Sequence, residues 1–140
     1  MGFLSSLDIS ASALTAQRMR MNVISENIAN ADTTRTADGE PYRRRVVTMG
    51  EKPSAFSDAL HSATGGGVMV TGIVEDASSF EYEYDPTHPD ANAQGYVAYP
   101  NVDETEEIID LMSATRSYEA NVTALNATKS MAIKALEISG

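Results

Sequence analysis

Apolar residues recur at seven-residue intervals near both ends of this 140-residue chain. The repeat near the start comprises Leu7, Leu14, Met21 and Ile28, with Ile24 beside them. The pattern near the finish runs through Ile108, Leu111, Thr115, Tyr118, Val122, Leu125, Lys129, Ala132 and Leu136. This spacing is typical of coiled-coil helices. Because an apolar helix face must be buried, we expect each helix to pack on the other or on neighbouring subunits.

Capping residues set the bounds of the two helices. Ser5 followed by Asp8 resembles a capping box, and no Pro or Gly interrupts the chain from there to about Asn30. Pro100 ends the preceding segment, and Asn101 is placed to cap a second helix that runs nearly to the end of the chain. The first turns of this helix hold Asp103, Glu104, Glu106 and Glu107. Their negative charge suits the positive end of the helix dipole.

Short segments rich in β-branched and aromatic residues lie between the two helices. We expect strands at residues 42–49, 68–74, 80–84 and 96–99, separated by turn-forming residues. A turn of helix is also expected at 54–63, with Phe56 and Leu60 on one side. The predicted fold class is therefore α+β. Coiled-coil helices at 1–34 and 100–140 pack together, and a small β-rich insert spans 35–99.

Composition favours a core that is shared between subunits. Aromatic residues make up 6% of the chain and Trp is absent, which is little for a packed globule. The net charge of -10 would repel phosphates, so nucleic-acid binding is not expected. Cys is absent, which excludes disulfides and thiol nucleophiles. The start of the chain lacks the features of a cleaved signal peptide, and no segment is apolar enough for membrane insertion.

The candidate catalytic and metal-binding groups have simpler interpretations. Neither His61 nor His88 has partners at metal-ligand spacing, and His88 is interpreted as a turn residue. The acidic run at 103–107 lies on an expected exposed helix start, without the apolar pocket that acid-base catalysis needs. We therefore predict no catalytic, cofactor-binding or metal-binding residues, and no enzymatic activity.

Three consecutive arginines, Arg43, Arg44 and Arg45, concentrate positive charge in an otherwise acidic chain. On a strand Arg44 would face the opposite side from the other two. One hypothesis is that these arginines bridge to an acidic patch of a neighbouring subunit. The other is that they form a solvated strand face.

Several segments resemble a known family. Residues 14–17 (LTAQ) and 22–34 (NVISENIANADTT) are similar to the N-terminal signature of bacterial flagellar rod, hook and hook-associated proteins. Segments 41–45, 85–90, 95–97, 100–103, 116–122 and 129–132 resemble the proximal-rod members of that family. The motif residues are Asn27, Asn30, Thr34, Tyr42, Arg43, Arg44, Arg116 and Asn121.

The resemblance implies a structural subunit of the flagellar basal-body rod, the drive shaft that crosses the periplasm. It implies export by the flagellar type III apparatus without a cleaved signal peptide. It also implies that the terminal helices pair into an inner tubular layer with the insert outside. The implied partners are copies of the chain, other rod proteins, the basal-body base and the export apparatus. We further expect the free chain to be loosely ordered at its ends and to gain helix on docking.

Two other classes of protein share some of these sequence features. A cytoplasmic coiled-coil adaptor or export chaperone would share the heptads, but it would not explain the central strands or the asparagine-rich end of the first helix. A small hydrolase would need a nucleophile with a partner base, and the sequence offers no such pair.

Overall fold

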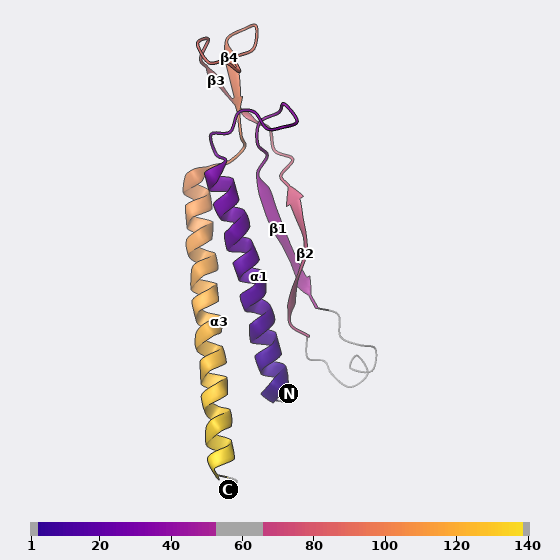
Figure 1. The fold of residues 1–140 in the computed structure, drawn as a ribbon, viewed down its shortest axis with the longest axis vertical. Coiled ribbons are helices and arrows are strands. Elements are labelled where there is room, and N and C mark those ends of the chain that lie inside the picture. Colours follow the sequence, from indigo (N-terminus) through magenta and orange to yellow (C-terminus); the bar gives the residue numbers. More distant parts are fainter. Residues whose placement is uncertain (1–2, 53–65, 139–140) are drawn as a thin grey trace.

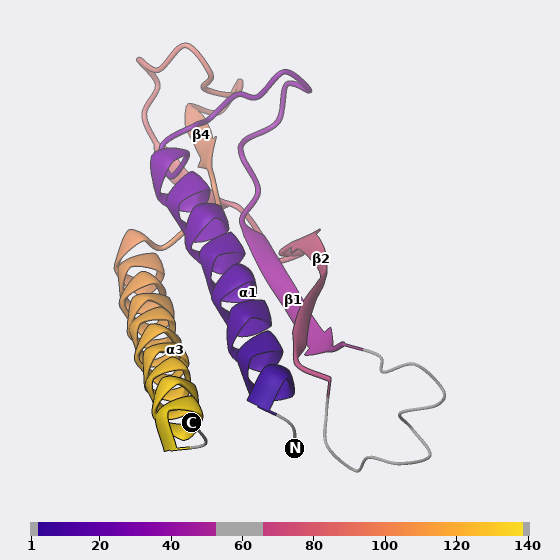
Figure 2. The same cartoon turned by 60° about the horizontal axis from the view of Figure 1, so that its bottom comes forward.

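Two long helices dominate the fold and lie side by side (Figures 1 and 2). The structure is a computed structural model that describes residues 3–52 and 66–138. Helix α1 spans Phe3–Ala29 and helix α3 spans Glu104–Ile138. The described residues between them form four strands in two antiparallel pairs. The α+β class is confirmed, with a long helix near each end of the chain and the strands between them.

The two helices run antiparallel and meet through small and medium-sized side chains. Asn27 near the end of α1 contacts Glu107 in the first turn of α3. Further along, the Thr115 hydroxyl lies 3.6 Å from the Met21 sulfur. Ala114 is buried on the α3 side of this interface. Such small residues allow close packing of helices at a coiled-coil type of contact.

The first strand pair lies along α1, on the side away from α3 (Figures 1 and 2). Strand β1 (Arg45–Glu51) pairs with β2 (Val68–Glu75), and the register shifts between Thr48 and Met49. At the base of β2, the Val68 amide donates to the Ser12 hydroxyl of α1 at 3.0 Å. Helix α1 is therefore covered by α3 on one side and by a strand pair on the other.

The predicted strand at 42–49 was wrong at its start, because β1 begins at Arg45. The Tyr42 amide donates to the Thr33 carbonyl, and the Arg44 amide donates to the Asn101 side chain. These backbone groups are therefore used by a loop and by a side chain instead of a strand ladder. The turn of helix expected at 54–63 lies outside the described residues.

The second strand pair forms the end of the molecule that is far from both termini (Figure 1). Strand β3 (Glu81–Tyr84) pairs with β4 (Tyr96–Tyr99). Val97 is buried, but every residue of β3 is exposed. The Tyr84 and Tyr96 rings meet edge to face with their centroids 5.3 Å apart. This two-stranded tip therefore presents an uncovered aromatic face.

Candidate assembly site

Asn27 is a fully buried polar residue where α1, β1 and α3 converge. Its amide nitrogen donates to the Arg45 carbonyl at 2.9 Å and to a Glu107 carboxylate oxygen at 3.0 Å. Its amide oxygen accepts from the Arg45 amide at 3.0 Å and from the Tyr42 hydroxyl at 2.9 Å. Both donors and both acceptor positions of this one amide are thus used to join the three segments. We call Asn27, Tyr42, Arg44, Glu107 and Asn101 the junction cluster.

Glu107 supplies a buried carboxylate at the start of α3, with 1% of its surface exposed. Arg44 donates to it through Nε at 2.6 Å. Burial opposes the charge of Arg44, but the hydrogen bond and charge of Glu107 outweigh this effect and raise the pKa of Arg44. A buried ion pair is tolerated only when both partners are hydrogen-bonded, and removal of either partner is strongly destabilising. The pair therefore ties the start of β1 to α3.

The expectation of an exposed acidic helix start was wrong for Glu107. Glu107 precedes Leu111 and Ala114 by four and seven residues, so it lies on the helix face that packs against α1. That spacing was a signal that could have placed it on the buried stripe. Asp103, Glu104 and Glu106 are exposed, as expected.

Tyr42 closes the junction cluster from the loop between α1 and β1. Its ring is buried and its hydroxyl donates to Asn27. Burial raises the pKa of Tyr42 above its ordinary value, and the charge of Arg45 partly opposes that rise. The phenol is therefore held in its neutral, hydrogen-bond-donating form.

Asn101 was predicted to cap α3, and this was wrong. Its side chain accepts from the Arg44 amide at 2.8 Å and donates to the Ser78 hydroxyl at 2.7 Å. Asp103 caps the helix instead, since its carboxylate accepts from the amides of Thr105 and Glu106. Asn101 is committed to segments distant in the sequence, so it is not available to the helix start.

Asp76 extends this network beyond the end of β2. Its amide donates to the Arg44 carbonyl at 2.8 Å, and its carboxylate lies 3.5 Å from the Arg44 guanidinium. The Ser78 amide donates to the carboxylate and, with the Ser78 side chain, lowers the pKa of Asp76 below its ordinary value. Its contact with Arg44 could not be foreseen from the local sequence, because the two residues are 32 positions apart.

The three consecutive arginines have different environments. Arg44 is engaged within the subunit, as described above, and it is 3.8 Å from Asp110. Arg43 lies 4.3 Å from the centre of the Phe80 ring and donates to two backbone carbonyls. The Arg45 side chain is about half exposed and lies 3.8 Å from Glu26. The hypothesis of a contact with a neighbouring subunit therefore remains a prediction that concerns Arg45 most directly.

A cleft of about 250 Å³ opens beside the junction cluster. Val23, Ile24, Val46, Val47 and Met49 form its apolar lining, and Arg20, Arg44, Arg45, Glu107 and Asp110 form its polar lining. Arg20 and Asp110 are 3.4 Å apart across it. The cleft combines apolar surface with partly exposed charges, which is a composition typical of a protein contact.

The residues predicted to form an assembly seam do not share one level of burial. Ile24 is buried on α1. The half-buried members are Leu7, Leu14, Met21, Ile28, Leu111, Tyr118, Val122 and Leu125. Ile108 and Leu136 are exposed on α3, as are Thr115 and Lys129. The face of α3 that packs against α1 also includes Ala114, which the predicted heptad pattern did not contain. Whether the exposed members contact neighbouring subunits remains a prediction.

The remaining motif residues lie apart from the junction cluster. The Asn30 amide donates to the Glu26 carbonyl at 2.8 Å, close to the end of α1. The Thr34 hydroxyl donates to Asp90 at 2.8 Å. Asn121 donates to the Ser117 carbonyl within α3, and Arg116 is exposed on the same helix. Asn30 and Asn121 bond only to carbonyls four residues earlier in their own helices. These motif residues therefore do not form a shared site.

The described part of the chain gives little support for a metal-binding site or a membrane span. His88 accepts a hydrogen bond from the Asp90 amide at 3.1 Å and faces the Tyr99 ring, while His61 lies outside the described residues. Within residues 3–52 and 66–138, no group of three or more His, Asp or Glu residues is arranged to hold a metal ion. Neither described helix is long and apolar enough to cross a membrane.

Comparison with known proteins gives consistent matches along the chain. Residues 7–35 match the family described as flagella basal body rod protein, and residues 93–138 match the C-terminal family of flagellar basal body rod FlgEFG proteins. Flagellar basal-body rod protein FlgC of Bacillus subtilis is 58% identical over 143 residues, covering 95% of both chains. The proteins of the same name in Borreliella burgdorferi and Escherichia coli O6:H1 are each 44% identical, covering 99% of this chain and 98% of the relative.

Proposed function

Because the chain belongs to the FlgC family of flagellar basal-body rod proteins, and is a structural rod subunit, we propose that its copies pack through their paired helices into the periplasmic drive shaft of the bacterial flagellum. In this proposal residues 1–34 and 100–140 form the inner helical layer. Residues 35–99 form the outer insert. The assembled shaft transmits torque and conducts exported subunits through its centre.

The observation that carries this proposal is that helix pairing leaves apolar surface uncovered. On α3, Ile108, Ile109 and Met112 are all about half exposed or more. Adjacent exposed apolar residues on a helix mark an interaction surface. Subunits of a helical tube need exposed apolar surface that is not already buried within the subunit, so that neighbouring copies can pack on it.

In this proposal the junction cluster fixes the orientation of β1 relative to the two helices. Asn27, Glu107 and Arg44 connect α1, α3 and β1 through bonds of 2.6–3.0 Å. Torque applied to the outer insert would reach the helices through these bonds. We propose that this is the role of the motif residues Asn27, Tyr42 and Arg44, which belong to the junction cluster.

The proposed partners are copies of this chain, other rod proteins, the basal-body base and the flagellar type III export apparatus. Export without a cleaved signal peptide is part of this proposal. The adaptor or chaperone alternative has no supporting observation, since the relatives that match nearly the whole chain are rod proteins.

A seam substitution in cells tests the proposal. Leu125 is half-buried on α3, and its replacement by Lys would place a charge in the helix seam. We expect Leu125→Lys to abolish the rod in electron micrographs of isolated basal bodies, while Leu125→Met retains it. Immunoblots of the exported fraction would verify that the variant chain is made and exported. Normal rods built from Leu125→Lys would contradict the seam.

A further inference from the structure

Strand β3 has a free edge at the tip of the molecule. It pairs with β4 alone, since these two strands form a two-stranded sheet in the described part of the chain. Every residue of β3 is exposed, so no other described segment covers this edge. The strand contains neither Pro nor Lys and pairs in a regular register, so it lacks features that natural proteins use to block such edges. An exposed edge of this kind can pair with an extended segment of another chain.

The side chains of β3 alternate between two kinds of surface. Tyr82 and Tyr84 lie on one face, where Tyr96 of β4 is paired with Tyr84. The exposed fractions are 65% for Tyr82, 63% for Tyr84 and 44% for Tyr96. Glu81 and Glu83 lie on the other face, and neither carboxylate forms an ion pair within residues 3–52 and 66–138. The free edge therefore offers aromatic rings on one side and unpaired negative charge on the other.

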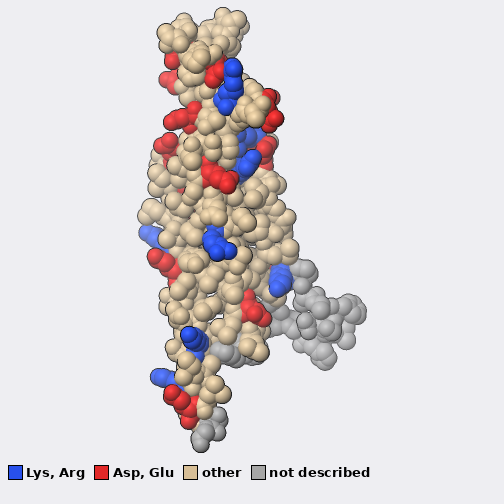
Figure 3. Space-filling model, in the orientation of Figure 1, with Lys and Arg blue, Asp and Glu red and all other residues tan. Residues whose placement is uncertain are grey.

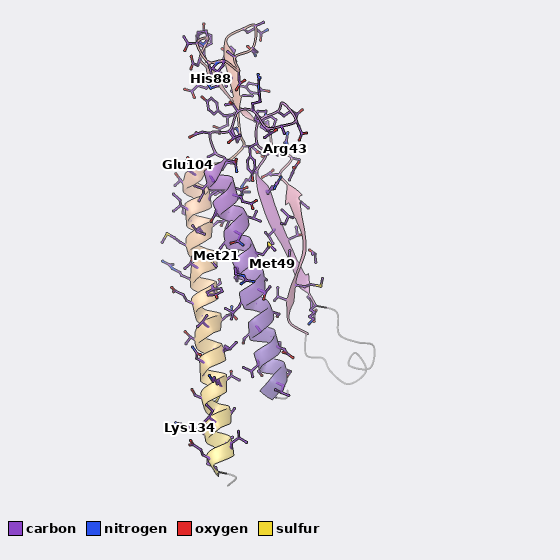
Figure 4. The ribbon with its side chains drawn as sticks, viewed as in Figure 1. Met21, Arg43, Met49, His88, Glu104 and Lys134 are labelled. Carbon is purple, nitrogen blue, oxygen red and sulfur yellow. The ribbon has the colours of Figure 1, made fainter. Side chains whose placement is uncertain are left out.

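The chain's own Arg43 covers the first ring of an aromatic row that continues along β3. Phe80, Tyr82 and Tyr84 are spaced by two residues, so they share a face where the chain is extended. The Arg43 guanidinium lies 4.3 Å from the centre of the Phe80 ring, at the base of the tip (Figure 4). Such a cation–π contact is favourable. Among the residues that the structure describes, no Lys or Arg covers the next two rings. The row therefore points to cationic side chains supplied by a partner.

The charge of the tip also favours a basic partner. Residues 76–99 contain no Lys or Arg, and their acidic residues are Asp76, Glu81, Glu83, Asp85 and Asp90. Figure 3 shows Asp and Glu side chains gathered over the upper part of the molecule, where the tip lies. A basic segment is attracted to such a surface, and an acidic segment is repelled. Side chains of an added strand also alternate, so basic residues could meet the rings on one face and the carboxylates on the other.

A second copy of this chain does not supply such a segment. Pairing of β3 with the β3 of another copy would join two strands that carry only negative charges. The basic run at 43–45 is already engaged within its own subunit. Arg44 binds Glu107, and Arg43 covers Phe80 and donates to two backbone carbonyls. The occupant of the edge is therefore a segment of a different protein.

We propose that the free edge of β3 binds an extended basic segment of a partner protein, which adds a third strand to the tip. Its Arg or Lys side chains lie over the two tyrosines of β3 and beside the two glutamates. This contact is at the opposite end of the molecule from the start of α1 and the end of α3, so it goes beyond the helix packing of the proposed function (Figure 1). The four residues of β3 span about 13 Å, so the contact is small and transient.

Two synthetic peptides test the edge contact on the full chain. The first is a blocked peptide of alternating Arg and Thr, and the second is the same peptide methylated on every backbone nitrogen. Both carry the same charge, but the methylated peptide cannot donate the backbone hydrogen bonds of an added strand. We expect titration by nuclear magnetic resonance to show binding of the first peptide at about 1 mM, and binding at least about tenfold weaker for the second. Equal affinities, or no binding of the first peptide, would overturn the proposal.

Variants of the chain test the two faces of β3. Tyr82→Thr keeps a strand-forming residue and should weaken binding of the unmethylated peptide at least about fivefold, whereas Tyr82→Phe should retain it. Glu81→Gln with Glu83→Gln should also weaken binding about fivefold. Glu119→Gln with Glu137→Gln is the matched control, because it removes the same charge from exposed positions of α3. All these positions are exposed, so the fold is retained. Equal losses for the two glutamine pairs, or no loss for Tyr82→Thr, would contradict the proposal.

A photoreactive side chain in place of Tyr82 identifies the occupant in isolated basal bodies. We expect a crosslink to a segment of another protein that is rich in Lys or Arg, mapped by mass spectrometry of the joined peptides. A crosslink to a second copy of this chain, or to a neutral or acidic segment, would overturn the inference. So would the absence of any crosslink in basal bodies that contain the chain. Absence of the chain from basal bodies would instead contradict the proposed function.

Discussion

Asn27 shows how much of this fold depends on one neutral side chain. It closes a hydrogen-bond set that a carboxylate or a hydroxyl could not reproduce, since the amide both donates twice and accepts twice. Its removal leaves the Tyr42 hydroxyl, the Arg45 backbone and Glu107 with unmet bonds. Each buried group without a partner costs about 1–3 kcal/mol.

We therefore predict that Asn27→Ala lowers the free energy of unfolding by about 2–4 kcal/mol. Asn22→Ala is the matched control, because Asn22 is exposed on the same helix and should change stability by less than about 0.5 kcal/mol. Urea titration followed by circular dichroism measures both. Equal midpoints for the two variants would show that the junction cluster does not stabilise the fold.

Tyr42 gives the fold a sensitivity to alkaline pH. Because burial raises the pKa of Tyr42 in the folded state, the folded chain holds the phenolic proton more tightly than the unfolded chain. The resulting stability is fully present below pH 10.0 and is lost as the pH rises through the folded-state pKa. Tyr42→Phe should unfold more easily at pH 8 but lose less stability as the pH rises above about 10. Urea midpoints at several pH values test this; parallel slopes would contradict it.

Several site residues could be foreseen and others could not, for physical reasons. Asn27 and Tyr42 were singled out by motif, but their bonds join segments whose approach depends on the whole fold. Glu107 was foreseeable from its spacing to Leu111 and Ala114 alone. The role of Asn101 was not foreseeable, because an Asn side chain that can cap a helix can equally well form hydrogen bonds with backbone groups distant in the sequence.

Among the elements, the two helices were the most predictable, because their apolar periodicity extends over many turns. The observed ends of α1 fall within two residues of the predicted ones at Ser5 and Asn30. Strand β4 was predicted at 96–99, as observed, whereas β1 begins at Arg45, three residues after the predicted start at Tyr42. Strand propensity does not reveal which backbone amides are already committed to loops and side chains.

Gly67 determines how closely β2 approaches α1. Its φ is +101°, and a Cβ there would lie 2.6 Å from the Ser12 hydroxyl oxygen. Gly39 also has a positive φ, of +83°, but a Cβ would meet no atom within 4 Å. We predict that Gly67→Ala costs at least about 1 kcal/mol more than Gly39→Ala, because it adds a steric clash to the same backbone strain. Urea unfolding compares them, and equal losses would contradict the close approach.

The molecule as a whole has little core of its own. The buried apolar residues in the described part of the chain are Ala16, Val23, Ile24, Ala31, Tyr42, Val97 and Ala114. This set is small for a chain of 140 residues, so the isolated subunit should be only marginally stable. The polar junction cluster joins α1, α3 and β1, and we expect assembly to bury the apolar surface that remains exposed.

A protein stabilised by association has a melting temperature that depends on concentration. We predict that the thermal midpoint of the purified chain rises by several degrees between about 5 µM and 500 µM. Ile109→Glu, which places a charge on exposed apolar surface of α3, should remove most of that rise while leaving the dilute midpoint unchanged. Scanning calorimetry measures both, and a midpoint independent of concentration would contradict a shared core.

The arrangement of the chain ends bears on how the protein can be labelled. Helix α1 begins and helix α3 ends at one end of the molecule, and the β3–β4 tip lies at the other end (Figure 1). A fluorescent protein fused at that end would lie beside the paired helices, through which the copies are proposed to pack. Insertion in the turn around Asn92 and Gly95, between β3 and β4, would instead carry the label away from the helices. Live imaging of motors in rotating cells should therefore use an internal fusion at the tip.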